Sequence, residues 1–217
     1  MNLVILGPQG SGKGTQAEKL AQKFDLEHID MGKFLREVAV LGSPLGKEIH
    51  EIINVRKELV DDKILKKVLH LKLQDLSREK GIIFDGVPRK QDQLEYFEAA
   101  MVEFGRHIDK IIYIKLSEKE SVERISKRRI CDKCKKVYIF GRDIEREDEK
   151  CLDCNGNIIH RIDDTPEGVK KRLGIFETET MPIVEYYKKQ GKTIEISGGQ
   201  GVEKVFEDIL GELGDIE

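Results

Sequence analysis

The sequence predicts an α/β fold in which a parallel sheet is flanked by helices. First, short runs of apolar and β-branched residues alternate along the chain with longer segments of helical periodicity. Second, these runs are continuously apolar, which is typical of strands buried on both faces of a parallel sheet. Third, a glycine-rich segment separates the first run from the first helical segment.

Each predicted strand depends on such a run. Four such runs lie at 3–6, 82–84, 111–114 and 193–196, and residues 27–29 form a weaker fifth. Helical spacing of apolar residues follows the glycine-rich segment at Ala17, Leu20, Ala21 and Phe24. The same spacing returns near the end of the chain at Val202, Val205, Phe206, Ile209, Leu210 and Leu213. Strand and helix therefore alternate from one end of the sequence to the other.

Helix starts are also visible in the sequence. Ser117 with Glu120 predicts a capping box, and Thr165 before Pro166 predicts a second helix start. Two stretches interrupt the alternation: residues 30–60 are charged and helical, and residues 127–164 carry all the cysteines. We expect both to be insertions at the ligand edge of one core domain, which comprises residues 1–29, 61–126 and 165–217.

Composition indicates an ordinary globular protein of 217 residues, with 36% charged residues and a formal charge of −3. Such a charge gives no global basic field, so we expect no nucleic-acid or membrane partner. The apolar run at residues 3–6 is too short for a signal peptide or a membrane span. We therefore expect a monomer in the cytoplasm.

The segment GPQGSGKGT at residues 7–15 follows a predicted strand and opens a predicted helix. In this context, glycines let consecutive backbone N–H groups turn toward phosphates, and the helix N-terminus adds positive potential. Lys13 would neutralise the β and γ oxygens of a triphosphate. A turn that only joins a strand to a helix needs neither the glycines nor the lysine. We therefore predict a loop that binds a nucleoside triphosphate for phosphoryl transfer.

The cysteines form a paired CxxC arrangement, Cys131 with Cys134 and Cys151 with Cys154. This spacing is typical of a structural zinc site, and a reducing compartment favours metal ligation over disulfides. Iron held by the same thiolates and a pair of disulfides are the alternatives. Because a closed four-cysteine site leaves no open coordination position, we assign it to stability.

The GKGT ending of the loop at residues 12–15 and the segment DGVPR at residues 85–89 resemble the nucleoside monophosphate kinases, and most closely the adenylate kinases. The resemblance covers essentially the whole chain. It implies a five-stranded parallel core with an acceptor-binding insertion at 30–60 and a mobile, zinc-bearing lid at 127–164. It also implies reversible transfer of a phosphoryl group from MgATP to AMP, giving two ADP.

The resemblance further implies four sets of site residues. The catalytic set is Lys13, Arg124, Arg128, Arg161, Asp163, Asp164 and Arg172. The ATP-binding set is Gly10, Ser11, Gly12, Lys13, Gly14, Thr15, Arg128, Val137, Tyr138 and Gln200. The AMP-binding set is Met31, Arg36, Glu58, Leu59, Val60, Gly86, Val87, Pro88, Arg89, Gln93, Arg161 and Arg172. Asp85 and Thr15 would hold Mg²⁺ through water.

Arginines suit this chemistry because the phosphates of two nucleotides repel each other and a guanidinium grips phosphate oxygens in a bidentate fork. Arg124 and Arg128 are four residues apart, so we predict that they share one face of a helix. No general base is needed, since an acceptor phosphate with a second pKa of about 6 is mostly ionised at pH 7.

Three departures from the family pattern concern the acceptor base. Residues 30–33 read DMGK in place of Ser-Thr-Gly-Asp, residues 56–58 lack the usual glycine, and Val87 replaces a common phenylalanine. Because the thioether of Met31 cannot replace a threonine hydroxyl, a different or broader base preference is an alternative.

Two further alternatives belong to other functional classes. One is an ATPase that binds nucleic acid through a zinc ribbon, with Lys133, Lys135 and Lys136 as its basic patch. The other is a nucleotide-binding protein without catalytic activity, which the residues at Met31 and Lys33 suggest.

Overall fold

A five-stranded parallel sheet forms the centre of the molecule in the computed structural model, which describes residues 1–56, 60–146, 148–160 and 164–214. The strand order is β2-β3-β1-β4-β8. The strands are β1 (Asn2–Leu6), β2 (Glu27–Asp30), β3 (Ile82–Asp85), β4 (Lys110–Lys115) and β8 (Thr193–Ser197). The five strands that the apolar runs predict are therefore confirmed, and so is the α/β fold class.

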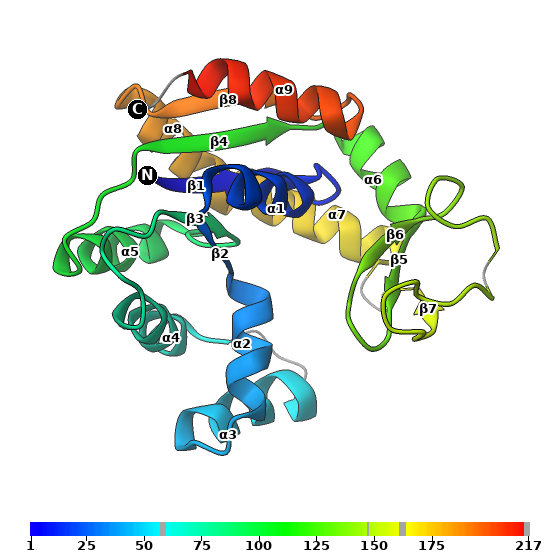
Figure 1. Cartoon of the computed structure of the whole chain (residues 1–217), viewed down its shortest axis with the longest axis horizontal. Coiled ribbons are helices and arrows are strands. Elements are labelled where there is room, and N and C mark those ends of the chain that lie inside the picture. The colour runs from blue at the N-terminus through cyan, green and yellow to red at the C-terminus, as the bar shows by residue number, and fades with distance from the viewer. Residues whose placement is uncertain (57–59, 147, 161–163, 215–217) are drawn as a thin grey trace.

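Helices cover both faces of this sheet (Figure 1). Successive side chains of a strand point to opposite faces, so Leu3 and Ile5 pack with α1 (Lys13–Phe24) and α9 (Val202–Leu213). Val4 and Leu6 pack into the other cluster, whose members include residues of three helices in the body of the molecule. These helices are α4 (Asp62–Gln74), α5 (Gln91–Glu103) and α8 (Met181–Lys189). Coverage on both faces explains the consecutive apolar residues of β1, β3 and β4.

The predicted helix starts are also confirmed. In α6 (Glu118–Ser126), the Glu120 N–H donates to the Ser117 hydroxyl at 3.3 Å and the Ser117 N–H donates to the Glu120 carboxylate at 3.1 Å. In α7 (Pro166–Ile175), the Thr165 hydroxyl caps the first turn. A π-helical turn, η2 (Phe176–Thr180), then joins α7 to α8.

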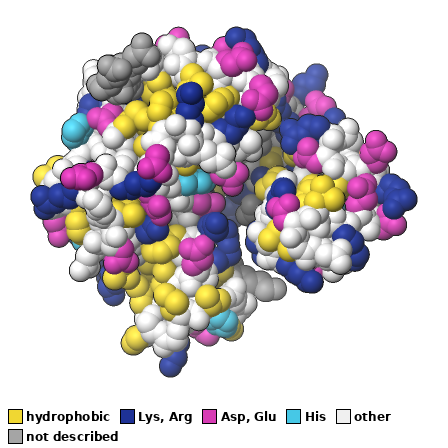
Figure 2. Space-filling model, viewed as in Figure 1, with side chains coloured by type: hydrophobic (Ala, Val, Ile, Leu, Met, Phe, Trp, Pro, Cys, Tyr) yellow, Lys and Arg dark blue, Asp and Glu magenta, His cyan; other side chains and the backbone are white. Residues whose placement is uncertain are grey.

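Two parts of the chain project from the body, one below β2 and one at the right of the view beyond α6 (Figure 1). One holds α2 (Met31–Val40), α3 (Pro44–His50) and the π-helical turn η1 (Glu51–Arg56). The other is a small lobe with an antiparallel sheet in the order β6-β5-β7, made of β5 (Arg128–Cys131), β6 (Val137–Ile139) and β7 (Ile158–Ile159). A hollow separates this lobe from the body (Figure 2).

The α-helices of the described ranges have 13 residues or fewer. None of them combines the length and the apolar composition that crossing a membrane requires.

We expect Ser117→Ala to destabilise the protein by about 1 kcal/mol, because it removes the side chain that caps α6. Urea denaturation at constant m value measures this change. Ser126→Ala is the matched control, since Ser126 lies at the other end of α6 and its hydroxyl bonds only the Glu123 carbonyl. Equal losses in the two variants would contradict the role of the capping box.

Candidate active site

The glycine-rich loop lies between β1 and α1. Gly10 and Gly12 adopt φ angles of 83° and 89°, in the left-handed region that glycine tolerates best. A Cβ at Gly7 would lie 2.6 Å from Ser11 Oγ and 2.8 Å from the Ile114 carbonyl oxygen. As the N-cap of α1, Gly12 offers no side chain to the first-turn N–H groups, which leaves them for an anion.

Burial and several charged side chains affect the pKa of Lys13, the first residue of α1. Lys13 is partly buried, and this burial is the main cause that lowers the pKa of its ammonium group. The carboxylates of Asp85 and Asp30 act in the opposite direction, whereas Arg89 and Arg128 lower the pKa further. The charge of Lys13 is therefore influenced both by Arg89, in the loop after β3, and by Arg128, at the start of β5.

Asp164 holds two of the predicted arginines. Arg128 donates from Nε to Oδ2 at 2.7 Å and from Nη2 to Oδ1 at 2.5 Å. Arg172 Nη2 donates to Oδ1 at 3.1 Å, and Gln9 Nε2 donates to the same oxygen at 3.2 Å. Because the Asp164 side chain is only 2% exposed, this carboxylate is a buried centre that joins β5, α7 and the phosphate loop.

The prediction that Arg124 and Arg128 share a helix face is wrong. Helix α6 ends at Ser126 and the chain turns at Lys127, so Arg128 begins strand β5. Arg124 remains on α6, where its guanidinium lies 3.4 Å from the carbonyl oxygens of Gly10 and Gln200. The two arginines therefore approach the site from different elements.

Two residues that the sequence analysis missed support the loop. Gln9 contacts Asp164, as described above, and the hydroxyl of Ser121 on α6 donates to the Gln9 carbonyl. Ser121 is fully buried. A serine inside a helix carries no pattern that indicates such a contact, because its partner is 112 residues away in the sequence.

The acceptor side gathers around the end of β3. Gly86 has a φ angle of 89°, and a Cβ there would lie 2.7 Å from Arg89 Nη2, so the guanidinium lies close over this glycine. Gln93 is 5% exposed and accepts the Arg89 N–H at 2.8 Å. The structure therefore brings Gly86, Arg89 and Gln93 together as the sequence predicts.

The side chains predicted for the base pocket differ in exposure. Met31 opens α2 and is 3% exposed, packed in the apolar cluster that also holds Val87 and contacts Val60. Arg36 on the same helix is exposed. Four predicted residues, Glu58, Leu59, Arg161 and Asp163, lie outside the described residues.

The oxygen donors at the end of β3 suit a hard cation. Asp85 is 7% exposed, and its Oδ2 lies 3.4 Å from the position that a Cβ of Gly14 would take. Thr15 offers an exposed hydroxyl on the next residue of the same helix. Carboxylate and hydroxyl oxygens, completed by water and phosphate, are the ligands that Mg²⁺ prefers. The residues present therefore fit this ion.

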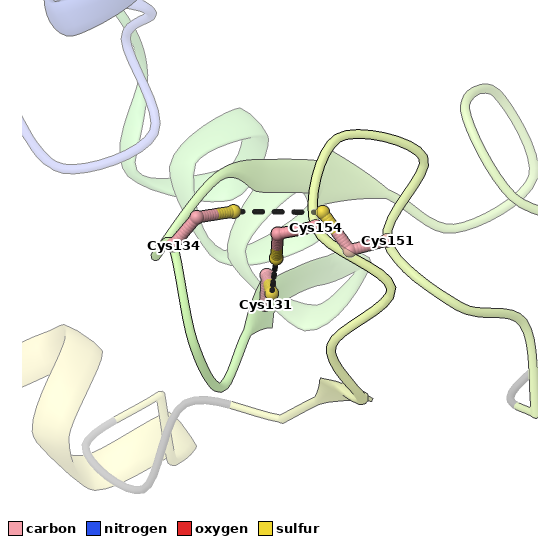
Figure 3. A group of neighbouring side chains, drawn as sticks. All are labelled: Cys131, Cys134, Cys151 and Cys154. Atoms are coloured by element: carbon pink, nitrogen blue, oxygen red, sulfur yellow. Dashed lines mark hydrogen bonds between the residues drawn. The ribbon is translucent and has the colours of Figure 1, made fainter.

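The four cysteines meet in the small lobe (Figure 3). Their Sγ atoms all lie within 4.8 Å of one another, at 3.4 Å for Cys131 with Cys154 and 3.5 Å for Cys134 with Cys151. A tetrahedral zinc ion with Zn–S bonds of about 2.3 Å places sulfurs about 3.8 Å apart, so the cluster fits such an ion. All four cysteines are unpaired, which argues against the disulfide alternative.

Tyr138 belongs to this cluster. Its side chain is 3% exposed, and its hydroxyl donates to Cys151 Sγ at 3.2 Å, which is the main cause that lowers the pKa of Cys151 to about 6. The same hydroxyl accepts the Leu152 N–H at 3.2 Å. Of the two residues of β6 predicted to bind ATP, only Val137 thus offers an exposed side chain, because Tyr138 is buried against Cys151 and pairs with Arg129 of β5.

Comparison with known proteins agrees with this geometry. A family model described as adenylate kinase matches residues 5–192. An adenylate kinase of Petrotoga mobilis is 41% identical over 97% of this chain and 96% of its own length. Adenylate kinases of Kosmotoga olearia and Archaeoglobus fulgidus are 38% and 37% identical, over 98% and 96% of this chain and 99% and 96% of their own lengths. With the phosphate loop, the parallel sheet and the cysteine cluster all in place, the chain belongs to the adenylate kinase family.

Proposed function

We propose that this protein transfers the terminal phosphoryl group of MgATP reversibly to AMP, giving two ADP. The observation that carries the proposal is the carboxylate of Asp164, which binds Arg128, Arg172 and Gln9 of the phosphate loop, in a chain of the adenylate kinase family. Two phosphate chains can meet only where their mutual repulsion is neutralised and water is excluded. This cluster supplies the charge for both nucleotides.

On the donor side, the loop from Gly10 to Thr15 would bind the phosphates of ATP through its N–H groups and Lys13. Arg124, Arg128, Arg161 and Arg172 would stabilise the charge that develops on the transferred group, with Asp163 and Asp164 orienting them. Val137, Tyr138 and Gln200 would contact the rest of ATP. The contacts of Asp164 with Arg128 and Arg172 support this arrangement.

On the acceptor side, Arg36 and Arg89 would bind the phosphate of AMP. The base would lie among Met31, Glu58, Leu59, Val60, Gly86, Val87, Pro88 and Gln93. Because the acceptor phosphate is mostly ionised at neutral pH, it attacks the terminal phosphorus of ATP without a general base.

A different or broader base preference remains the second candidate. The burial of the Met31 side chain favours it, because a buried thioether offers a base no hydrogen bond where a threonine hydroxyl is usual.

The two projecting parts would act as moving covers. We assign residues 30–60 to acceptor binding and residues 127–164 to a lid that closes over the phosphates before transfer. Closure would bring the arginines of the lid onto the donor and exclude water from the reacting atoms. The hollow between lobe and body supports this assignment (Figure 2).

Two metal ions fit the residues present. Asp85 and Thr15 would hold Mg²⁺ through water, and the ion would supply positive charge that offsets the charge of the donor phosphates. Zinc, held by Cys131, Cys134, Cys151 and Cys154, would stabilise the small lobe, which buries few apolar side chains of its own.

ATP, AMP and ADP are the partners that we propose, for a monomer in the cytoplasm that binds neither nucleic acid nor membrane. A formal charge of −3 supports the absence of polyanionic partners. The four unpaired cysteines suit a reducing compartment.

A rate panel with MgATP and AMP, GMP, CMP, UMP or dAMP tests the proposed acceptor. We expect AMP to be phosphorylated with the highest kcat/KM, because Gln93 and the family pattern favour adenine. Failure of AMP while another monophosphate reacts would replace the acceptor and leave the kinase class in place. Salt-dependent nucleic-acid binding without any monophosphate phosphorylation would instead favour the zinc-ribbon ATPase.

Lys13→Ala should lower kcat by a factor on the order of 10³, because it removes the cation closest to the phosphate loop. Steady-state kinetics with saturating nucleotides measures this loss. Lys19→Ala is the matched control: Lys19 lies on the same helix and pairs with Glu203 at 2.7 Å. A Lys13→Ala enzyme with a normal rate would refute the mechanism.

Elemental analysis of the native protein should find about one zinc per chain, and chelation should lower its melting temperature. Tyr138→Phe removes the hydrogen bond to Cys151, so we expect zinc affinity in chelator competition to fall roughly 10-fold or more. Tyr186→Phe is the control, because the Tyr186 hydroxyl bonds Glu98 at 3.0 Å. A native protein without zinc would refute the metal site.

A further inference from the structure

The backbone of Arg89 is bonded at both of its polar groups. Its N–H donates to Gln93 Oε1 at 2.8 Å, and its carbonyl accepts from Thr180 Oγ1 at 2.9 Å. Gln93 and Thr180 are each 5% exposed, whereas Arg89 itself is exposed. The backbone is therefore anchored in the interior while the guanidinium stays accessible to an anion.

A third hydrogen bond orients Gln93. Its Nε2 donates to Asp62 Oδ1 at 2.8 Å. A backbone N–H can only donate and a carboxylate can only accept, so the Gln93 amide has a single orientation between Arg89 and Asp62. Without Asp62, the amide could turn and the acceptor for the Arg89 N–H would be lost.

These bonds join elements that are distant in the sequence. Thr180 ends the π-helical turn η2 and lies 91 residues from Arg89, and Asp62 is the first residue of α4 and lies 31 residues from Gln93. A π-helical turn inside a helix often occurs at a functional site. Here the Thr180 hydroxyl reaches the loop that follows β3.

We infer that Thr180 and Asp62 are positioning residues for the acceptor phosphate. They fix the backbone from which Arg89 reaches its ligand, Thr180 directly and Asp62 through Gln93. This inference rests on the proposed function in one respect, since it takes the Arg89 guanidinium as the group that binds the phosphate of the acceptor. A donor lost at Thr180 leaves the Arg89 carbonyl without this partner, so the guanidinium samples other positions.

Thr180→Val tests the first residue. We expect the KM for AMP to rise about tenfold while the KM for MgATP stays within twofold of the wild type. Thr180→Ser, which keeps the hydroxyl, should restore most of the affinity. Thr178→Val is the matched control, because Thr178 lies in the same turn, is exposed and bonds only carbonyls of its own helix. An unchanged KM for AMP, or a loss that serine does not rescue, would overturn the role of Thr180.

Asp62→Ala tests the second residue and does not depend on how well Thr180→Val folds. Its KM for AMP should also rise several-fold, whereas Asp62→Asn, whose carbonyl can still accept from Gln93, should remain close to the wild type. Asp92→Ala, at an exposed carboxylate in the first turn of α5, is the control. Equal effects of Asp62→Ala and Asp92→Ala would overturn the role of Asp62.

Amide hydrogen exchange at Arg89, followed by NMR without nucleotide, separates this inference from the proposed function. Exchange should be at least tenfold faster in Thr180→Val and Asp62→Ala than in the wild type and in Thr178→Val. Faster exchange in a protein that does not phosphorylate AMP would refute the proposed acceptor but support the role of Thr180 and Asp62 in fixing the Arg89 backbone. Unchanged exchange would overturn the positioning role of Thr180 and Asp62 even if AMP is the acceptor.

Discussion

The buried carboxylate of Asp164 holds two arginines side by side in the absence of any nucleotide. The positive charge that phosphate binding needs depends on this interaction. Arg128 and Arg172 both bond Oδ1 of Asp164, and their guanidinium groups would repel each other without this carboxylate between them. Asp164 accepts three hydrogen bonds from the two guanidinium groups, two of them in a bidentate pair. Charge-assisted bonds of this kind offset the cost of burying the charges. Because Asp164 also accepts from Gln9, the two guanidinium groups are fixed near the phosphate loop.

The parallel sheet explains why the other charged groups lie near that point. The carboxyl ends of parallel strands meet at one edge, so the loop after β1 and the residues Asp85 to Arg89 at the end of β3 are neighbours. β1 pairs with β3 through Ile5 and Asp85, which places that carboxylate beside the start of the glycine-rich loop. Charged side chains from distant parts of the sequence therefore lie at the same edge of the sheet as Lys13.

The small lobe has a different source of stability. Its buried cluster contains Cys131, Tyr138, Ile144, Cys151 and Ile158, which is too few side chains for an independent core. Four thiolates around one ion can supply the missing free energy. The Tyr138 hydroxyl links β6, the strand that carries Val137, to Cys151 of this cluster.

The sequence by itself determined the strands, the helix starts, the glycine-rich loop and the paired cysteines, because each depends on residues close together in the chain. It also indicated Lys13, Arg89 and Gln93 through the family pattern. Only the tertiary structure decided that Arg128 begins a strand, that Asp164 holds both arginines, that the Tyr138 side chain faces a cysteine, and that Thr180 bonds the Arg89 backbone. The last of these contacts joins residues 91 apart. Such contacts form when separate elements pack together, so local patterns of hydrophobicity and spacing do not encode them.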